Sequence, residues 1–312
     1  MTKKKKFKEN FLRNIPLLLM ALPGIVYIFV LRYIPIYGII IAFKDFRIHK
    51  NGFLYSLMTS KWVGFKNFEF LFKTQDAKII FRNTIGYSLL FLFLGMIFQI
   101  IVALLLLEMT NRRTVKVYQT LIIFPHFLSM VIVAFFVYVF LAPNEGVINN
   151  MLMAMGFQKI EWYMEPKYWP YILTIVTLWK GTGYGSIMYL ATITGFDQEL
   201  YEAAVIDGAT KWQQTTNITL PLLKPIISIM LILGLSNVLG ADFGLFYQVP
   251  RNIPMLNPAT NVIPTFVYRA LMNMGNIVMP AAAGLLQSVA GFILIIVANT
   301  VVRMINPENS LF

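Results

Sequence analysis

The feature that most constrains this chain is a series of six long apolar segments. A helix needs about 20 residues, at about 1.5 Å each, to cross roughly 30 Å of hydrocarbon, and each segment is long enough. Apolar side chains surround each segment on all sides, which is typical of membrane spans and not of amphipathic surface helices. We therefore predict an all-α polytopic membrane protein with about six transmembrane helices. Their expected positions are residues 15–43, 84–107, 120–141, 168–194, 222–241 and 278–302.

The composition agrees with a lipid-embedded chain and excludes several kinds of site. Hydrophobic residues make up 58% of the 312 residues and charged residues only 13%, whereas a soluble domain holds about half and a quarter respectively. The chain has no cysteine, which excludes disulfides, thiolate metal ligands and a cysteine nucleophile. Its two histidines argue against a histidine-rich metal centre. We predict no catalytic residue and no metal site.

The net charge of +12 is placed to orient a membrane protein. The densest basic run, Lys3 to Lys6, comes just before the first apolar segment, so it reads as a membrane-orienting flank and not as a nucleic-acid contact. With this flank included, lysine and arginine number twelve on each side of the membrane, so the total count does not decide the orientation. The first flank favours a cytoplasmic N-terminus (1–14), and an even number of spans returns the tail (303–312) to the cytoplasm. We expect a multi-pass protein of the plasma membrane.

The segment between the fourth and fifth spans reads as a helix, a tight turn, a second short helix and a stop. Residues 199–206 are mostly good helix formers, and Asp207-Gly208 supplies a turn because glycine adopts positive φ without a Cβ penalty. Pro221 is expected to break the pattern before the fifth span. Such a pair could fit the groove of another protein or be an ordinary cytoplasmic loop, and the residue pattern alone leaves both readings open.

The same segment carries a recognisable motif. Glu202-Ala203-Ala204, two residues, Asp207-Gly208-Ala209, eight residues and then Ile-x-Leu220-Pro221 resembles the EAA loop of binding-protein-dependent ABC importer permeases. The runs at 43–46, 62–68 and 146–149 are similar to those of sugar permeases of the MalF/MalG type, in particular the subgroup that imports oligosaccharides and polysaccharides. Thr215 departs from the family, which usually has phenylalanine there, and we expect Trp212 to supply the missing bulk.

The resemblance implies a fold, a function and partners. The fold would be the type I ABC importer (MetI-like) permease fold, with a permease domain at 15–302 that includes a coupling loop at 196–221. The function would be import of sugars, expected to be oligosaccharides and potentially acidic ones.

The partners would be a second homologous permease forming a heterodimer, two ATPase subunits, an extracytoplasmic solute-binding protein, the lipid bilayer and the oligosaccharide. The chain itself would need no cofactor, because ATP and Mg bind the ATPase subunits. The residues expected to couple to the ATPase are Glu202, Ala203, Ala204, Asp207, Gly208, Ala209, Leu220 and Pro221.

Polar groups near mid-membrane indicate where a sugar could bind. The fourth span offers Trp179, Lys180, Gly181 and Tyr184, and the fifth offers Ser236 and Asn237. An aromatic ring beside donors and small residues suits a sugar, which stacks on the ring and hydrogen-bonds through its hydroxyls. Lys180 has two readings: a contact for an acidic sugar, or a structural role such as a buried pair with Asp242 or a contact with the partner subunit.

Two other functions compete with the importer. An ion-coupled secondary transporter would need acidic or histidine residues in mid-span, and the six segments hold almost none. A channel is the second alternative. The chain has no GxxxxGK[ST] motif, so an importer built on it requires a separate ATPase.

Overall fold

The structure, a computed structural model, describes residues 14–305, 307 and 310, except residue 74. Within these ranges the regular elements are helices, apart from an isolated bridge between Lys44 and Trp62. The long elements are α2 (Ile15–Ile28), which continues through a π-helical turn (Phe29–Tyr33) into a 3-10 helix (Ile34–Phe43), α5 (Gln75–Leu107), α6 (Arg112–Phe127), α7 (Met130–Leu141), α9 (Trp169–Thr194), α12 (Leu220–Ser236) and α16 (Val278–Ile305).

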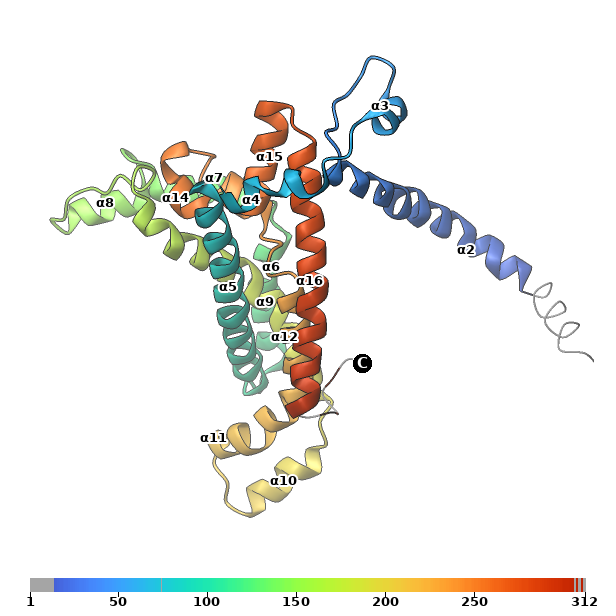
Figure 1. The fold of residues 1–312 in the computed structure, drawn as a ribbon. Helices are drawn as coiled ribbons and strands as arrows, with labels where there is room; N and C mark the ends of the chain where they lie inside the picture. The colour runs from blue at the N-terminus through green and yellow to red at the C-terminus, as the bar shows by residue number, and fades with distance from the viewer. Residues whose placement is uncertain (1–13, 74, 306, 308–309, 311–312) are drawn as a thin grey trace, which may run out of the picture.

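Short helices gather at the two ends of the bundle (Figure 1). One end carries α3 (Phe53–Thr59), a 3-10 turn (Gly64–Phe68), α4 (Phe70–Lys73), α8 (Val147–Ala154), a 3-10 turn (Pro166–Tyr168), α13 (Phe243–Gln248), a 3-10 turn (Pro254–Leu256), α14 (Asn257–Thr260) and α15 (Ile263–Met274). The opposite end carries α10 (Gln198–Ile206) and α11 (Lys211–Gln214), followed by a π-helical turn (Thr215–Thr219).

Helix α9 is the centre of the bundle. It packs along α5 and against α6, while α12 packs against α16, α5 and α9. Towards the end that carries α13, buried Trp169 and Leu173 of α9 meet Val133 of α7 and Phe246 of α13. Towards the end that carries α10, buried Tyr189 of α9 belongs to a second apolar cluster with residues of α5 and α12. Two separate cores therefore hold α9 near its two ends.

Helix α2 leaves the bundle and none of its residues is buried (Figure 1). Only the end of the following 3-10 helix returns to the bundle, where Ile41 and Ala42 are buried and the segment packs on α16. The apolar surface of α2 is therefore covered by lipid or by another protein.

The prediction of an all-α membrane fold is confirmed. Four helical stretches in the described residues are long and apolar enough to cross a membrane: Ile15–Phe43, Asp76–Leu107, Lys211–Ser236 and Val278–Met304. The pair α6 and α7 makes a fifth if it counts as one broken span. Helix α9, with 26 residues, is about 39 Å long and so long enough to span, but it is not among these apolar stretches; its middle contains Lys180.

The prediction of one helix at 120–141 is wrong. The chain breaks after Phe127, and α6 and α7 meet at 99°. Pro125 cannot donate a helical hydrogen bond, Leu128 is extended, and the Ser129 hydroxyl then accepts from the Ile132 amide at 3.4 Å to begin α7. A proline followed by a good N-cap residue therefore ends one helix and starts another.

The structure contains the expected fifth span, but the expected bounds of 222–241 and the expected stop at Pro221 are wrong. The helix runs on from Lys211 to Ser236, with Pro221 in the first turn of α12 directly after the π-helical turn. In a π turn each amide bonds the carbonyl five residues back and not four, so the turn shifts the hydrogen-bond register. Pro221 stands where the regular α-helical register resumes and no amide hydrogen bond is needed from it, so the helix continues. It ends at Asn237, whose side chain donates to the Gly240 carbonyl at 3.3 Å.

Candidate functional site

The α10–α11 hairpin is fixed by its own backbone and caps. The Asp197 carboxylate accepts from the Glu199 amide at 3.0 Å and so begins α10. At its other end the Gly208 amide donates to the Val205 carbonyl at 3.0 Å, and the Ala209 amide donates to the Ala204 carbonyl at 2.9 Å. These two bonds form a Schellman turn, and Gly208 has the φ of +77° that this turn requires. The turn after α10 is therefore geometrically defined.

Side chains join α10 and α11 to the start of α12. Thr210 and Gln213 form a capping box at α11, and buried Gln214 donates to the Ala209 carbonyl at 3.3 Å. The Tyr201 hydroxyl lies 3.0 Å from the hydroxyl of buried Thr219 in the π-helical turn. Since Lys211–Ser236 is one continuous helical stretch, the contact of Tyr201 with Thr219 attaches α10 to the same helical stretch that contains α12.

The hairpin presents most of its motif outward. No residue of α10 is buried; Glu202, Ala203, Asp207 and Gly208 are exposed, while Ala204, Ala209, Leu220 and Pro221 are half-buried. Val205 and Ile206 are 61% and 86% exposed. A short helix with apolar side chains in water needs a partner surface to bury them. The expected packing of Trp212 is wrong, because this side chain is 74% exposed.

Lys180 braces the break between α6 and α7. Its ammonium donates to the carbonyls of His126 at 2.6 Å, Leu128 at 2.7 Å and Pro125 at 3.3 Å. The last carbonyls of a helix lack intrahelical partners, and a lysine near that end can satisfy them. The alternative pair with Asp242 does not form in the residues described, because the Asp242 carboxylate instead accepts from the Leu245 amide at 3.2 Å and caps α13.

The other predicted sugar contacts of α9 divide between two sides of the helix. The ring of Tyr184, half exposed, stacks on His126 at 4.1 Å between centroids, and a Cβ added at Gly181 would meet open space. At about 100° per residue, Gly181 and Tyr184 face the same side. Trp179 lies elsewhere, lining an apolar cavity of about 570 Å³ between α5, α6 and α9. A stacked ring beside open space could receive a sugar.

Ser236 and Asn237 are occupied by their own backbone. The Ser236 hydroxyl donates to the Leu233 carbonyl at 2.6 Å, and the Asn237 amide donates to Gly240. No hydrogen bond joins either side chain to Trp179, Lys180, Gly181 or Tyr184 in the part of the chain that the structure describes. The six residues predicted for sugar binding therefore do not form one hydrogen-bonded cluster within this chain.

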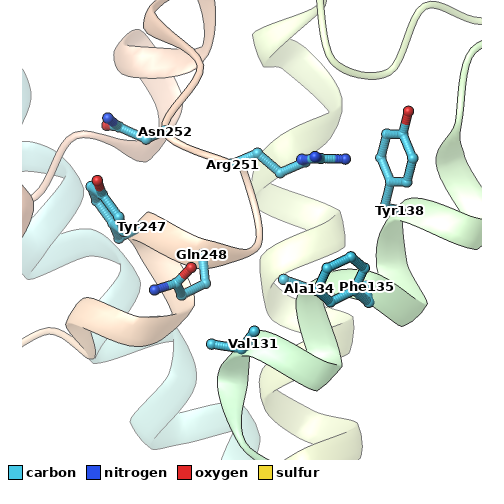
Figure 2. A pocket seen from close by; sticks show the side chains of 8 residues that line it. All are labelled: Val131, Ala134, Phe135, Tyr138, Tyr247, Gln248, Arg251 and Asn252. Carbon is cyan, nitrogen blue, oxygen red and sulfur yellow. The ribbon is translucent and has the colours of Figure 1, made fainter.

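The sequence interpretation missed two features at the end that carries α8 and α15. Buried Asn149 accepts from the Ile160 amide at 3.1 Å and the Trp162 indole at 3.0 Å, which fixes the segment after α8. Arg251 lines a cavity between α7 and the end of α13 with the turn that follows it (Figure 2). The available signal was an arginine–asparagine pair between Pro250 and Pro254, which marks a constrained turn that carries a cation.

Comparisons with known proteins agree on one family. The family described as "Binding-protein-dependent transport system inner membrane component" matches residues 95–308. The polygalacturonan/rhamnogalacturonan transport system permease protein YteP of Bacillus subtilis is 33% identical, over 98% of this chain and 93% of that protein. Protein LplB of the same organism is also 33% identical, over 94% of this chain and 90% of its own length.

Solved structures give the same result. A bacterial ABC transporter involved in the import of the acidic polysaccharide alginate contains a chain that superposes with a TM-score of 0.86 at 32% identity, covering 96% of this chain and 99% of that one. A second structure, of a bacterial alginate ABC transporter in complex with an alginate pentasaccharide-bound periplasmic protein, gives a TM-score of 0.85 at 32% identity over 95% of this chain and 97% of that one.

Proposed function

Because this chain belongs to the family of binding-protein-dependent transport system inner membrane components, we propose that it carries an acidic oligosaccharide or polysaccharide across the membrane. It is a multi-pass permease subunit of an ABC importer and is not itself an ATPase. The proposed solute is supported by the similarity, over nearly the whole chain, to proteins whose names specify polygalacturonan and alginate. Both are polymers of uronic acids, so carboxylates on pyranose rings are the shared chemistry.

The α10–α11 hairpin is the proposed contact with a cytoplasmic ATPase. Its exposed Glu202 and Asp207 can pair with basic groups of that subunit, and exposed Val205 and Ile206 can fill an apolar groove. Two ATPase subunits are proposed, since each permease of a pair presents one such hairpin. This arrangement requires α10 on the cytoplasmic side, which in turn requires both termini to be cytoplasmic.

The proposed sugar path follows the side of α9 that bears Gly181 and Tyr184. The Tyr184 ring can stack on a pyranose, and the missing side chain at Gly181 leaves room beside it. Trp179, Ser236 and Asn237 would contribute only after a rearrangement, because they lie in other surroundings here. Lys180 is proposed to hold the α6–α7 break, since its three donors are already used.

A second, related permease is the proposed neighbour of α2. No residue of this helix is buried in its own chain, although its side chains are strongly apolar. A heterodimer would place part of this surface against the partner and leave the rest to lipid. Cysteine crosslinking from exposed Leu19 or Leu22 to the second permease tests this contact, and crosslinks that form only between copies of this chain would favour a homodimer.

Reconstitution tests the proposed solute. The importer, assembled from this permease, its partner permease, the ATPase and the solute-binding protein, is placed in proteoliposomes with ATP inside. We expect uptake of trigalacturonate that stops when ATP is withheld, with slower uptake of the neutral trimethyl ester. Uptake of neutral oligosaccharides with none of trigalacturonate would contradict the acidic-solute proposal.

A further inference from the structure

A cavity separate from the proposed path opens at the end of the bundle opposite the α10–α11 hairpin. It has a volume of about 380 Å³ and lies between α7 on one side and the end of α13 with the turn that follows it on the other. Figure 2 shows Arg251 extending towards Tyr138 of α7, with Phe135 also on α7 and Gln248 at the end of α13. The volume is large enough for one sugar unit, and aromatic rings, amides and a cation line the same space.

Arg251 is the only charged side chain among the residues that line this cavity. Its guanidinium lies 4.2 Å from the centre of the Tyr138 ring and extends between the two walls (Figure 2). No salt bridge includes Arg251 within the described ranges, so no carboxylate there neutralises its charge. A guanidinium matches the two oxygens of a carboxylate geometrically, and its aromatic support holds it in place.

The backbone holds Arg251 in a costly conformation. Arg251 and Asn252 have φ of 56° and 51°, in the left-handed region that side chains other than glycine and asparagine rarely adopt. Two 3.0 Å hydrogen bonds stabilise this turn, from the Arg251 amide to the Gln248 carbonyl and from the Asn252 amide to the Tyr247 carbonyl. Arg269 also donates to the Asn252 side chain at 3.1 Å. The two backbone bonds have the pattern of a Schellman turn, which ends α13 and fixes the backbone of Arg251.

A buried hydroxyl lies behind the ring that supports Arg251. Tyr163 packs edge-on against Tyr138 with 5.7 Å between ring centroids, and its hydroxyl has no hydrogen-bond partner in the described part of the chain. Burial raises the pKa of Tyr163 to about 12, although the nearby Arg251 charge opposes this shift. Tyr163 is therefore neutral at every physiological pH and does not neutralise Arg251.

We propose that this cavity is a receiving subsite for one uronate residue of the incoming oligosaccharide, on the side of the membrane away from the ATPase. The Arg251 guanidinium would pair with the carboxylate, while Phe135 and Tyr138 contact the pyranose ring and Gln248 bonds a hydroxyl. The inference rests on the proposed function, because it assumes an acidic sugar and an outward-facing position. It goes further by assigning charge selection to a named residue outside the mid-membrane path.

Direct binding tests the subsite. The assembled importer, without solute-binding protein and without ATP, is placed in nanodiscs of phosphatidylcholine and titrated with trigalacturonate or its trimethyl ester by calorimetry. The two ligands differ in charge but not in ring structure. One charge-assisted bidentate contact at a solvent-exposed site is expected to give the acid about a tenfold affinity advantage. Arg251→Asn should remove this advantage by lowering the affinity for the acid to about that for the ester.

Matched variants separate the charge at this position from other effects. Arg251→Asn keeps a residue that tolerates positive φ, so the turn should persist. Lys159→Gln removes a cation at the same end of the molecule but outside the cavity, and should keep the tenfold preference. Tyr138→Leu should weaken both ligands through the lost ring contact, and the acid more than the ester, because Arg251 also loses its aromatic support. This last variant also keeps the test informative if the Arg251 variant fails to assemble.

Three results would overturn the subsite. The first is equal affinity of the wild type for the acid and the ester. The second is an unchanged preference for the acid in Arg251→Asn. The third is loss of trigalacturonate binding when phosphatidylglycerol is added to the nanodiscs, which would identify a lipid headgroup as the occupant. ATP-driven uptake of trigalacturonate by the same wild-type complex is measured in parallel. If the wild-type complex takes up trigalacturonate but Arg251→Asn does not change the preference for the acid over the ester in the titration, the subsite is rejected and the proposed function stands.

Discussion

Replacing Lys180 tests whether the mid-membrane cation serves the fold or the solute. Its ammonium forms two short bonds, at 2.6 and 2.7 Å, with carbonyls at the α6–α7 break. Hydrogen bonds to charged groups contribute about 1.5–3 kcal/mol each, so the low end for two bonds gives about 3 kcal/mol. Lys180→Met removes both bonds, whereas Lys180→Gln keeps a neutral donor. We expect the free energy of unfolding to fall by about 3 kcal/mol in the Met variant and by less in the Gln variant.

The assay combines stability and transport. Unfolding of the purified permease in increasing SDS gives the stability change, and proteoliposome uptake compares trigalacturonate with its neutral ester. A structural brace predicts equal loss of uptake for both ligands, in proportion to the loss of stability. Lys224→Gln, at an exposed lysine of α12, is the control and should change neither. Unchanged stability together with selective loss of trigalacturonate uptake would refute the brace and restore Lys180 as a contact for acidic sugar.

Three further predictions concern the hairpin, a helix crossing and the segment after α8. Glu202→Lys should uncouple ATP hydrolysis from uptake without loss of the assembled complex, as measured by the ATPase activity per sugar imported. Glu199→Lys, at another exposed glutamate of α10, is the matched control. Normal coupling in Glu202→Lys would show that Glu202 has no coupling role. Gly183→Ala should lower the melting temperature of the complex, because the added Cβ overlaps the Ile122 carbonyl of α6. Gly181→Ala, whose Cβ would lie in open space, is the control and should leave the melting temperature unchanged. Equal melting temperatures of the two variants would show that α6 and α9 can move apart. Asn149→Ala should cost about 2–3 kcal/mol by leaving buried groups of the 160–162 segment unpaired, and proteolysis near Lys159 should become faster; an unchanged cleavage rate would contradict this.

The sequence predicted the features that depend on local composition. Apolar length located most membrane helices, because lipid imposes the same requirement on every span. The turn at Gly208 followed from one residue's conformational freedom, and the structure contains it. The positions of the coupling residues on an exposed hairpin also follow from this local pattern, although their contact with an ATPase stays a prediction.

The errors arose where distant residues decide a local outcome. Pro125 and Ser129 mark the break after Phe127 locally, but the angle of 99° leaves carbonyls that only Lys180, more than fifty positions away, satisfies among the contacts of the described residues. Pro221 was read as a stop because a proline interrupts a regular α-helix, but a preceding π turn changes the register it must fit. The proposed subsite around Arg251 needs α7 and the segment after α13 to lie side by side, and no periodicity within either segment predicts that contact.

The two cations of this chain that bear on charge selection differ in a way that suits transport of a polyanion. Lys180, in the middle of α9, has its charge engaged by three backbone carbonyls, whereas Arg251 has no carboxylate partner among the described residues. A strong free cation at mid-membrane would bind each passing carboxylate tightly and slow its release, because transport needs sites that are weak enough to leave. A cation placed at the receiving end can select acidic sugars before they enter and does not retain them on the way. Arg251→Asn should therefore reduce the preference for trigalacturonate over its ester in uptake while leaving the maximal uptake rate of the ester unchanged. Equal loss of uptake for both ligands would instead assign Arg251 a structural role.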